Sequence, residues 1–187
     1  MALANRAAGL AVAALVAAFS AHPASATETC QVVLTVFGEI SNSNRGPIDP
    51  FDDVLIYRLG ADFEAAYGFC QDDLTALPQA TITADYGNFD DGPVTATGPT
   101  LASVLEAAGA SSSLNDVVLT AFDGYQYVVE AGTDMSQVLA AIEADGAVLD
   151  FGGRGPVWIF AEPGVINDAS GDLDDGLVWA LVMIEVE

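Results

Sequence analysis

The chain has 187 residues, of which 27 are acidic and only four are lysine or arginine, giving a formal net charge of −23. Such a charge repels nucleic acid and anionic lipid, so neither is expected as a partner. With 52% hydrophobic and 17% charged residues, the composition predicts a folded protein and excludes a disordered acidic tail. A saline habitat is one explanation for the acid excess, because salt screens the self-repulsion.

Residues 1–26 have the features of a secretory signal peptide. Arg6 precedes an alanine-rich apolar run, and Ala24-Ser25-Ala26 supplies the small-x-small pattern that signal peptidase cleaves. A membrane anchor is the alternative, but the uncharged stretch is short for a stable span and no stop-transfer pattern follows. We expect cleavage after Ala26, one domain over residues 27–187, and a periplasmic or secreted protein with no membrane insertion.

Cleavage changes the chemistry that the remaining chain can perform. It removes the only histidine, His22, and leaves three arginines, no lysine and all 27 acids. The mature chain is therefore one unit more negative than the full chain. Without histidine, Ser-His-Asp and Cys-His catalytic sites and histidine-ligated metal centres are excluded. Without lysine, Schiff-base chemistry is excluded too.

Cys30 and Cys70 are the two cysteines of the chain. In an oxidising compartment, two cysteines are expected to form a disulfide. The alternative is a pair of thiolate metal ligands, which the lack of a Cys-x-x-Cys spacing disfavours. We therefore expect a structural disulfide between Cys30 and Cys70.

The first part of the mature chain alternates strand-like and loop-like segments. Residues 31–37 are β-branched and aromatic and predict a strand, whereas the Asn, Gly and Pro of residues 38–53 are typical of a loop. Residues 54–69 are ambiguous, because VLIYRL is compatible with a strand and ADFEAAYGF favours a helix. Residues 73–77 then predict one helical turn, and residues 80–84 predict a strand.

A short return strand over residues 94–97 leads to the clearest helix. The helix begins after Gly98-Pro99 and is terminated by Gly109. Its apolar residues recur at i, i+3, i+4 and i+7 and share one face: Leu101, Val104, Leu105 and Ala108.

Two Asp-Gly dipeptides predict two-residue hairpin turns. Asp123-Gly124 lies between strand-like residues 117–122 and 125–130, and Asp145-Gly146 separates VLAAIEA from AVLDF. VLAAIEA has helical propensity, but the turn favours a hairpin. With the apolar strands VWIFA and MIEVE, the predicted fold is α+β, with mixed, mainly antiparallel sheets and few short helices.

Several side chains that could attract a functional interpretation have ordinary structural explanations. Tyr125 and Tyr127 lie on a hairpin strand, and one of them is expected to face the core and the other solvent. Trp158 and Trp179 are expected to be core anchors. The acidic run at residues 168–176 does not match the helix-loop-helix calcium template, so we interpret it as a solvated loop, with a looser calcium site as the alternative.

Several short motifs follow one another in a distinctive order. They are DLTALPQ (73–79), GPTLxxVLEAAG (98–109), DGY (123–125), DG (145–146) and GRGPVWIF (153–160). This order resembles that of the oxidoreductase molybdopterin-binding domain, which has the sulfite-oxidase-like fold, over residues 31–187. The resemblance is to small, exported, single-domain members, and it implies an α+β core with a pterin-cofactor cleft.

The resemblance also implies where a metal would be held. Catalytic members ligate molybdenum through a cysteine in the loop after the strand that precedes the helix. The corresponding residues 81–87 contain no cysteine, and Cys70 lies upstream. The ligand is therefore absent or replaced by a harder one such as Asp85. Asp85, Tyr86 and Asn88 are the candidate ligand-binding residues of this loop.

Arg154 is the only arginine on a motif shared with that family. One interpretation is a structural pair with Asp150 or another nearby carboxylate. The other is a ligand contact assisted by the backbone amides of the neighbouring glycines, which could form an anion-binding nest. Molybdopterin carries a phosphate, and three arginines in a strongly negative chain are a poor match for it.

Three classes of function remain open. The first is an exported, non-catalytic relative of that family, with no cofactor and no catalytic residue, that binds a small ligand or an exported partner protein. The second is a genuine molybdopterin-dependent oxidoreductase with a non-cysteine ligand such as Asp85. The third is a structural or interaction module whose cleft is filled by side chains.

Overall fold

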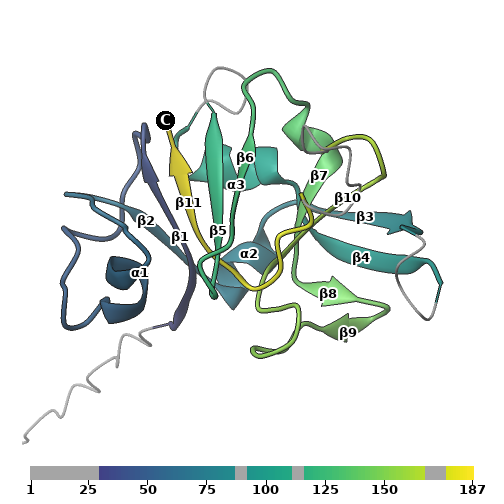
Figure 1. Ribbon diagram of the computed structural model, residues 1–187, viewed down its shortest axis with the longest axis horizontal. Coiled ribbons are helices and arrows are strands. Elements are labelled where there is room, and N and C mark those ends of the chain that lie inside the picture. The colour runs from purple at the N-terminus through teal and green to yellow at the C-terminus, as the bar shows by residue number, and fades with distance from the viewer. Residues whose placement is uncertain (1–29, 87–91, 111–115, 167–175) are drawn as a thin grey trace, which may run out of the picture.

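The computed structural model describes residues 30–86, 92–110, 116–166 and 176–187. The expected signal peptide, Asn88 and most of the acidic run at 168–176 lie outside these ranges. The described protein is mixed α+β, with mostly antiparallel sheets and few short helices, as the sequence predicts (Figure 1). None of its helices is long and apolar enough to cross a membrane.

The largest sheet has five strands in the order β2-β1-β11-β5-β6. These strands are β1 (Val32–Gly38), β2 (Tyr67–Cys70), β5 (Val117–Ala121), β6 (Gln126–Val129) and β11 (Leu181–Val186). β1 and β11 pair in parallel, and the other pairs are antiparallel. The first and last described strands therefore lie side by side inside this sheet. The hairpin predicted at Asp123-Gly124 joins β5 to β6 and is confirmed, but its turn is not the predicted two-residue one, because Ala121 bonds to Tyr125 and leaves three residues between them.

A smaller four-stranded antiparallel sheet has the order β3-β4-β8-β9, and β7 and β10 form a separate antiparallel pair. These strands are β3 (Gln79–Ala84), β4 (Val94–Pro99), β7 (Val138–Ala141), β8 (Glu143–Ala144), β9 (Ala147–Val148) and β10 (Trp158–Ala161). In Figure 1 the five-stranded sheet lies left of centre and the four-stranded sheet lies to the right.

Two glycine-containing segments fix how the smaller sheet is built. A Cβ atom on Gly98 would lie 2.4 Å from the carbonyl oxygen of Ala140, so only glycine allows β4 to pass this close to β7. Asp145 and Gly146 have φ values of 50° and 77°, as the tight turn between β8 and β9 requires. The predicted hairpin is confirmed, and the helical alternative for VLAAIEA is wrong.

The helices are α1 (Val54–Arg58), α2 (Gln71–Ala76), α3 (Leu101–Ala107) and the short 3-10 helix η1 (Met135–Gln137). α3 matches the predicted helix. The Thr100 side chain caps it by accepting a hydrogen bond from the Ser103 amide at 3.1 Å. Gly109 ends it at a φ of +75°. Its predicted apolar face is buried.

In residues 54–69 the first half forms a helix and the second half a strand, which is the reverse of what their local propensities favour. Residues 54–58 form α1 and residues 67–70 form β2. β2 pairs with β1 and buries Phe69, whereas α1 buries only Ile56 and exposes Val54. Pairing with the sheet therefore outweighs the helical propensity of the second half of this segment.

The expected disulfide between Cys30 and Cys70 is present, with Cα atoms 5.8 Å apart. Cys70 ends β2 and lies opposite Val32 of β1. The bond therefore holds Cys30, two residues before β1, against the end of the edge strand β2.

The tryptophans and tyrosines divide between core and surface. Trp158 is fully buried, as predicted for a core anchor, but Trp179 is 50% exposed, so that prediction is wrong. Trp179 precedes β11 beside Ala180, which has a φ of +47°, so the ring lies on a turn at the surface. Tyr125 is 43% exposed and Tyr127 packs partly buried against the core, as expected for one solvent-facing and one core-facing ring. Because residues two apart on a strand share a face, the difference comes from the position of Tyr125 in the turn before β6.

Candidate functional site

A hollow of about 330 Å³ lies between the start of β1 and α1. Its walls are mainly apolar and include Val32, Val54, Leu55 and Phe151. Its polar side chains include the ion pair between Arg45 and Asp53. A small apolar site with a few placed polar groups is typical of ligand-binding hollows in proteins.

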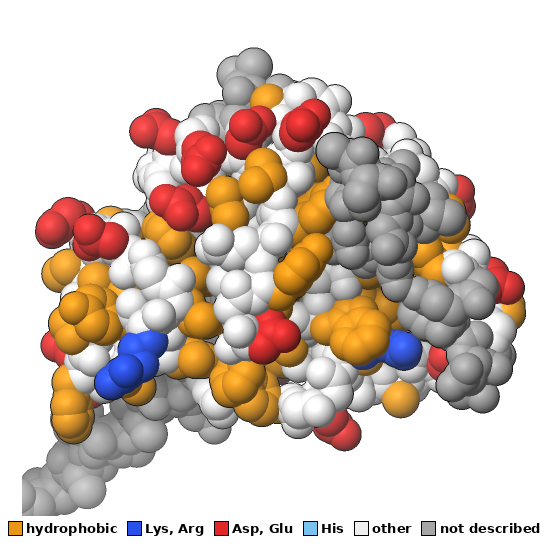
Figure 2. Space-filling model, in the orientation of Figure 1, with side chains coloured by type: hydrophobic (Ala, Val, Ile, Leu, Met, Phe, Trp, Pro, Cys, Tyr) orange, Lys and Arg blue, Asp and Glu red, His pale blue; other side chains and the backbone are white. Residues whose placement is uncertain are grey.

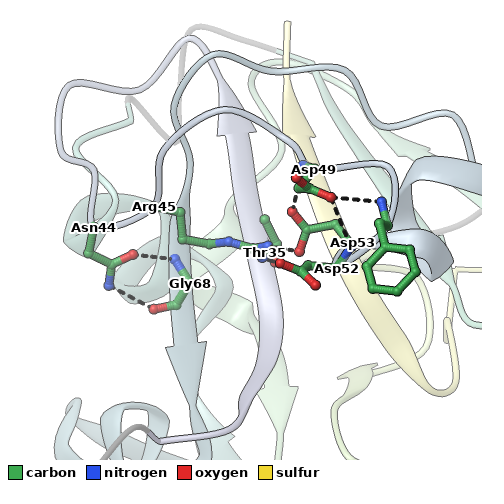
Figure 3. Close-up of polar contacts among 8 residues, drawn as sticks. Thr35, Asn44, Arg45, Asp49, Asp52, Asp53 and Gly68 are labelled. Atoms are coloured by element: carbon green, nitrogen blue, oxygen red, sulfur yellow. Dashed lines mark hydrogen bonds and ion pairs between the residues drawn. The ribbon is translucent and has the colours of Figure 1, made fainter. Parts of the chain in front are cut away.

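Arg45 is held from both sides inside this hollow. Its guanidinium donates hydrogen bonds to the Thr35 hydroxyl and to the Asp53 carboxylate, and both members of the ion pair are about one-fifth exposed. Figure 3 shows the Arg45 side chain extending across β1 toward Thr35 and the aspartates. Residues 38–53 were predicted only as a loop, because nothing local reveals that Arg45 pairs with Asp53.

The Asn44 side chain attaches the same loop to the sheet through hydrogen bonds like those between the backbones of two strands. The Asn44 amide donates to the Gly68 carbonyl at 2.9 Å, and its oxygen accepts from the Gly68 amide at 2.7 Å. The backbone amides of Asn44 and Arg45 both donate to the Ala66 carbonyl. These bonds fix the backbone from which Arg45 reaches Asp53 (Figure 3).

Asp49 organises the turn that leads into α1. Its carboxylate accepts hydrogen bonds from the backbone amides of Asp52 at 3.0 Å and Phe51 at 2.8 Å. These two bonds stabilise the charged form and lower the pKa of Asp49 below its usual value of 3.8. The Asp49 amide in turn donates to Asp53 at 3.0 Å, which connects the turn to the ion pair.

Replacing Asp49 by asparagine is expected to lower stability at neutral pH and to leave it unchanged in acid. The folded-state pKa is below the unfolded value of 3.8, so the stabilisation is fully present above that value. It is lost as the pH falls through the folded pKa, because the protonated carboxyl then resembles the neutral amide. Urea midpoints of both proteins across this pH range measure the effect. A difference that stays constant at every pH would contradict it.

A second hollow, of about 350 Å³, adjoins the first through Phe151. Its exposed rings are Phe122, Phe151 and Trp179, and we call it the aromatic groove. Phe122 and Phe151 meet edge to face, with centroids 5.1 Å apart and planes at 89°. Asp123 contributes a carboxylate, and the backbone of residues 152–153 completes the wall.

On the face drawn in Figure 2, acidic side chains are common and apolar side chains lie between them. Blue cationic groups are sparse on this face. The composition of 27 acids against four cations explains this appearance. A cationic or apolar group therefore meets less electrostatic resistance at this surface than an anion does.

Tyr86 and Arg154, two of the predicted site residues, lie at opposite ends of β10. The Tyr86 hydroxyl donates to the Ala161 carbonyl at 2.7 Å, at the end of that strand. The Arg154 guanidinium lies before the strand, 4.8 Å from the Trp158 ring centroid and 5.0 Å from that of Trp179. Arg154 is thus packed between two tryptophans by cation–π contacts.

Buried rings connect these two residues. The Trp158 and Phe160 centroids are 4.7 Å apart, and the Tyr86 and Phe160 centroids are 6.1 Å apart. Trp158 and Phe160 are fully buried, so aromatic carbon occupies the interval between Arg154 and Tyr86. Asp85 is exposed directly after β3, and Asn88 lies outside the described residues.

One cluster of side chains in the described part of the chain could in principle ligate a metal ion. It consists of Cys30, Cys70 and Asp73, whose ligand atoms lie within 4.8 Å of one another. The two sulfurs are joined in the disulfide, and Asp73 accepts the Cys70 amide hydrogen bond at 2.9 Å, which caps α2. The two sulfurs are therefore bonded to each other and are not thiolates, and the Asp73 carboxylate serves as a helix cap.

The side chains that line the two hollows are suited to contacting a bound ligand. The described side chains that line them include no histidine, lysine or thiol. They do provide exposed aromatic rings, one ion pair and carboxylates. No protein-family model matches the chain, and no curated protein matches it either.

Proposed function

We propose that this protein is an exported, non-catalytic binding protein on a scaffold related to the oxidoreductase molybdopterin-binding domain. The observation that carries the proposal is the disulfide between Cys30 and Cys70, which uses both cysteine sulfurs of the chain. A thiolate ligand for molybdenum is therefore missing, in agreement with the lack of a cysteine after β3.

The packing around β10 supports the same proposal. In the related family, the loop after β3 and the Arg-Gly-Pro loop are expected to face one cofactor cleft. Here Tyr86 and Arg154 contact opposite ends of a buried series of rings. The residues present do not fit a phosphorylated pterin, because the only cation among the candidate residues is stacked between tryptophans.

The ligand or exported partner is proposed to bind along the two hollows that share Phe151. Phe151 is 64% exposed, so most of this large apolar ring faces solvent and does not contribute to the core. Exposed aromatic side chains beside small hollows are typical of binding surfaces, where they supply most of the contact energy.

The proposal predicts that the protein contains no molybdenum when it is purified from its native exported compartment. Cells are grown with added molybdate, so that a low metal content does not reflect starvation. Elemental analysis and pterin fluorescence of the purified protein provide the measurement. Stoichiometric molybdenum with a pterin would contradict the proposal and support the oxidoreductase alternative, in which Asp85→Ala would lose the metal.

A further inference from the structure

We infer that the aromatic groove is a binding site for an organic cation of the quaternary ammonium class. This inference rests on the proposed binding function and names the chemistry of its ligand. It starts from three rings that lie far from one another in the sequence: Phe122 in the β5–β6 turn, Phe151 in the loop after β9, and Trp179 before β11.

The three rings keep much of their surface exposed to solvent. Phe122, Phe151 and Trp179 are 43%, 64% and 50% exposed, yet they surround one hollow of about 350 Å³. Phe122 and Phe151 meet edge to face at 89°, and Arg154 covers one face of Trp179, so a ligand would contact the ring surface that remains exposed. The face of an aromatic ring carries negative electrostatic potential and attracts a cation placed over it.

Charge favours a cation over any other ligand. Asp123 contributes a carboxylate to the groove lining, and the mature chain is expected to retain all 27 acids with only three arginines. A net negative charge of this size raises the local concentration of cations and repels anions. Arg154 contacts the Trp179 ring but does not line the groove, so it supports that ring without occupying the hollow.

The scarcity of hydrogen-bond acceptors distinguishes between classes of cation. A primary ammonium carries three N–H donors, each of which needs an acceptor when it leaves water. The side chains that line the groove offer one carboxylate, and Asp123 already accepts the Tyr125 amide at 2.9 Å. A quaternary ammonium has no N–H donor, so an aromatic lining with a single carboxylate suits it better.

The test is calorimetric titration of the mature protein with choline at constant ionic strength. The comparison ligand is the tert-butyl analogue of choline, in which carbon replaces the nitrogen and the positive charge is lost. We expect saturable binding of choline and at least about tenfold weaker binding of the neutral analogue. Ring currents are also expected to shift the N-methyl proton signal of bound choline upfield.

Variants locate the site. Trp179→Leu is expected to weaken choline binding about tenfold and to reduce the upfield shift. Asp123→Asn keeps the acceptor of the β5–β6 turn and is expected to weaken binding through loss of charge alone. Phe51→Leu is the matched control, because Phe51 is 87% exposed and does not line the groove, so its affinity is expected to be unchanged.

Equal affinity for the neutral analogue, an equal loss in Phe51→Leu, or no saturable binding of choline would each overturn the inference. Circular dichroism of each variant separates loss of binding from loss of fold. A metal-free protein that fails to bind choline would overturn this inference alone. Stoichiometric molybdenum would instead contradict the proposed function.

Discussion

Replacing Cys70 by serine is expected to lower the free energy of unfolding by about 4 kcal/mol, because the disulfide closes a loop with a sequence separation of 40 residues. The unfolded chain gains that loop's conformational freedom when the bond is lost. The bond also holds β2 at the edge of the five-stranded sheet, where its one partner among the described strands is β1. Urea unfolding of the oxidised wild type and of the variant measures the difference.

The control is the double variant with serine at both Cys30 and Cys70. It should match the single variant, since each lacks the same cross-link, and it has no free thiol that could react. Thiol titration of the native wild type provides an independent check. Two reactive thiols in the native protein, or equal stability of wild type and double variant, would contradict the structural role of this bond.

Replacing Trp158 by alanine is expected to cost about 3–5 kcal/mol of stability. Trp158 is fully buried, and its ring contacts Phe160 at 4.7 Å between centroids and lies 4.8 Å from the Arg154 guanidinium. Truncation therefore leaves a cavity in the middle of the ring series. Trp179→Ala is expected to cost less than about 1 kcal/mol, because that ring is half exposed.

The two tryptophan variants form a matched pair for one residue type in two environments. Urea unfolding of both gives the comparison directly, and Trp158→Phe is expected to fall between wild type and Trp158→Ala because it refills part of the cavity. Similar losses in Trp158→Ala and Trp179→Ala would show that the assigned division between core and surface is wrong.

Elements with strong local signals can be predicted from this sequence. The Asp-Gly turns require residues that tolerate positive φ, and α3 has a capping threonine, an apolar face and a terminating glycine within eleven residues. Residues 54–69 cannot be predicted in this way. Their propensities are weak, and the pairing of β2 with β1, which involves distant residues, decides their conformation.

The candidate site is predictable only in part for the same reason. Asp85, Tyr86 and Arg154 can be selected from the order of motifs, but their contacts depend on β10 and its buried rings. The aromatic groove assembles Phe122, Phe151 and Trp179 from three separate turns. A tryptophan in an apolar sequence context predicts a core residue, whereas Trp179 is half exposed beside Ala180, whose φ is +47°.

Native mass spectrometry of the protein secreted by its own cells tests the central claim, that this is an exported scaffold without a metal cofactor, most directly. We predict a single species with the mass of residues 27–187 less the two hydrogens lost on forming the disulfide, and no additional bound mass of a molybdenum–pterin. A species that retains residues 1–26, has both thiols reduced, or carries that additional mass would contradict the account.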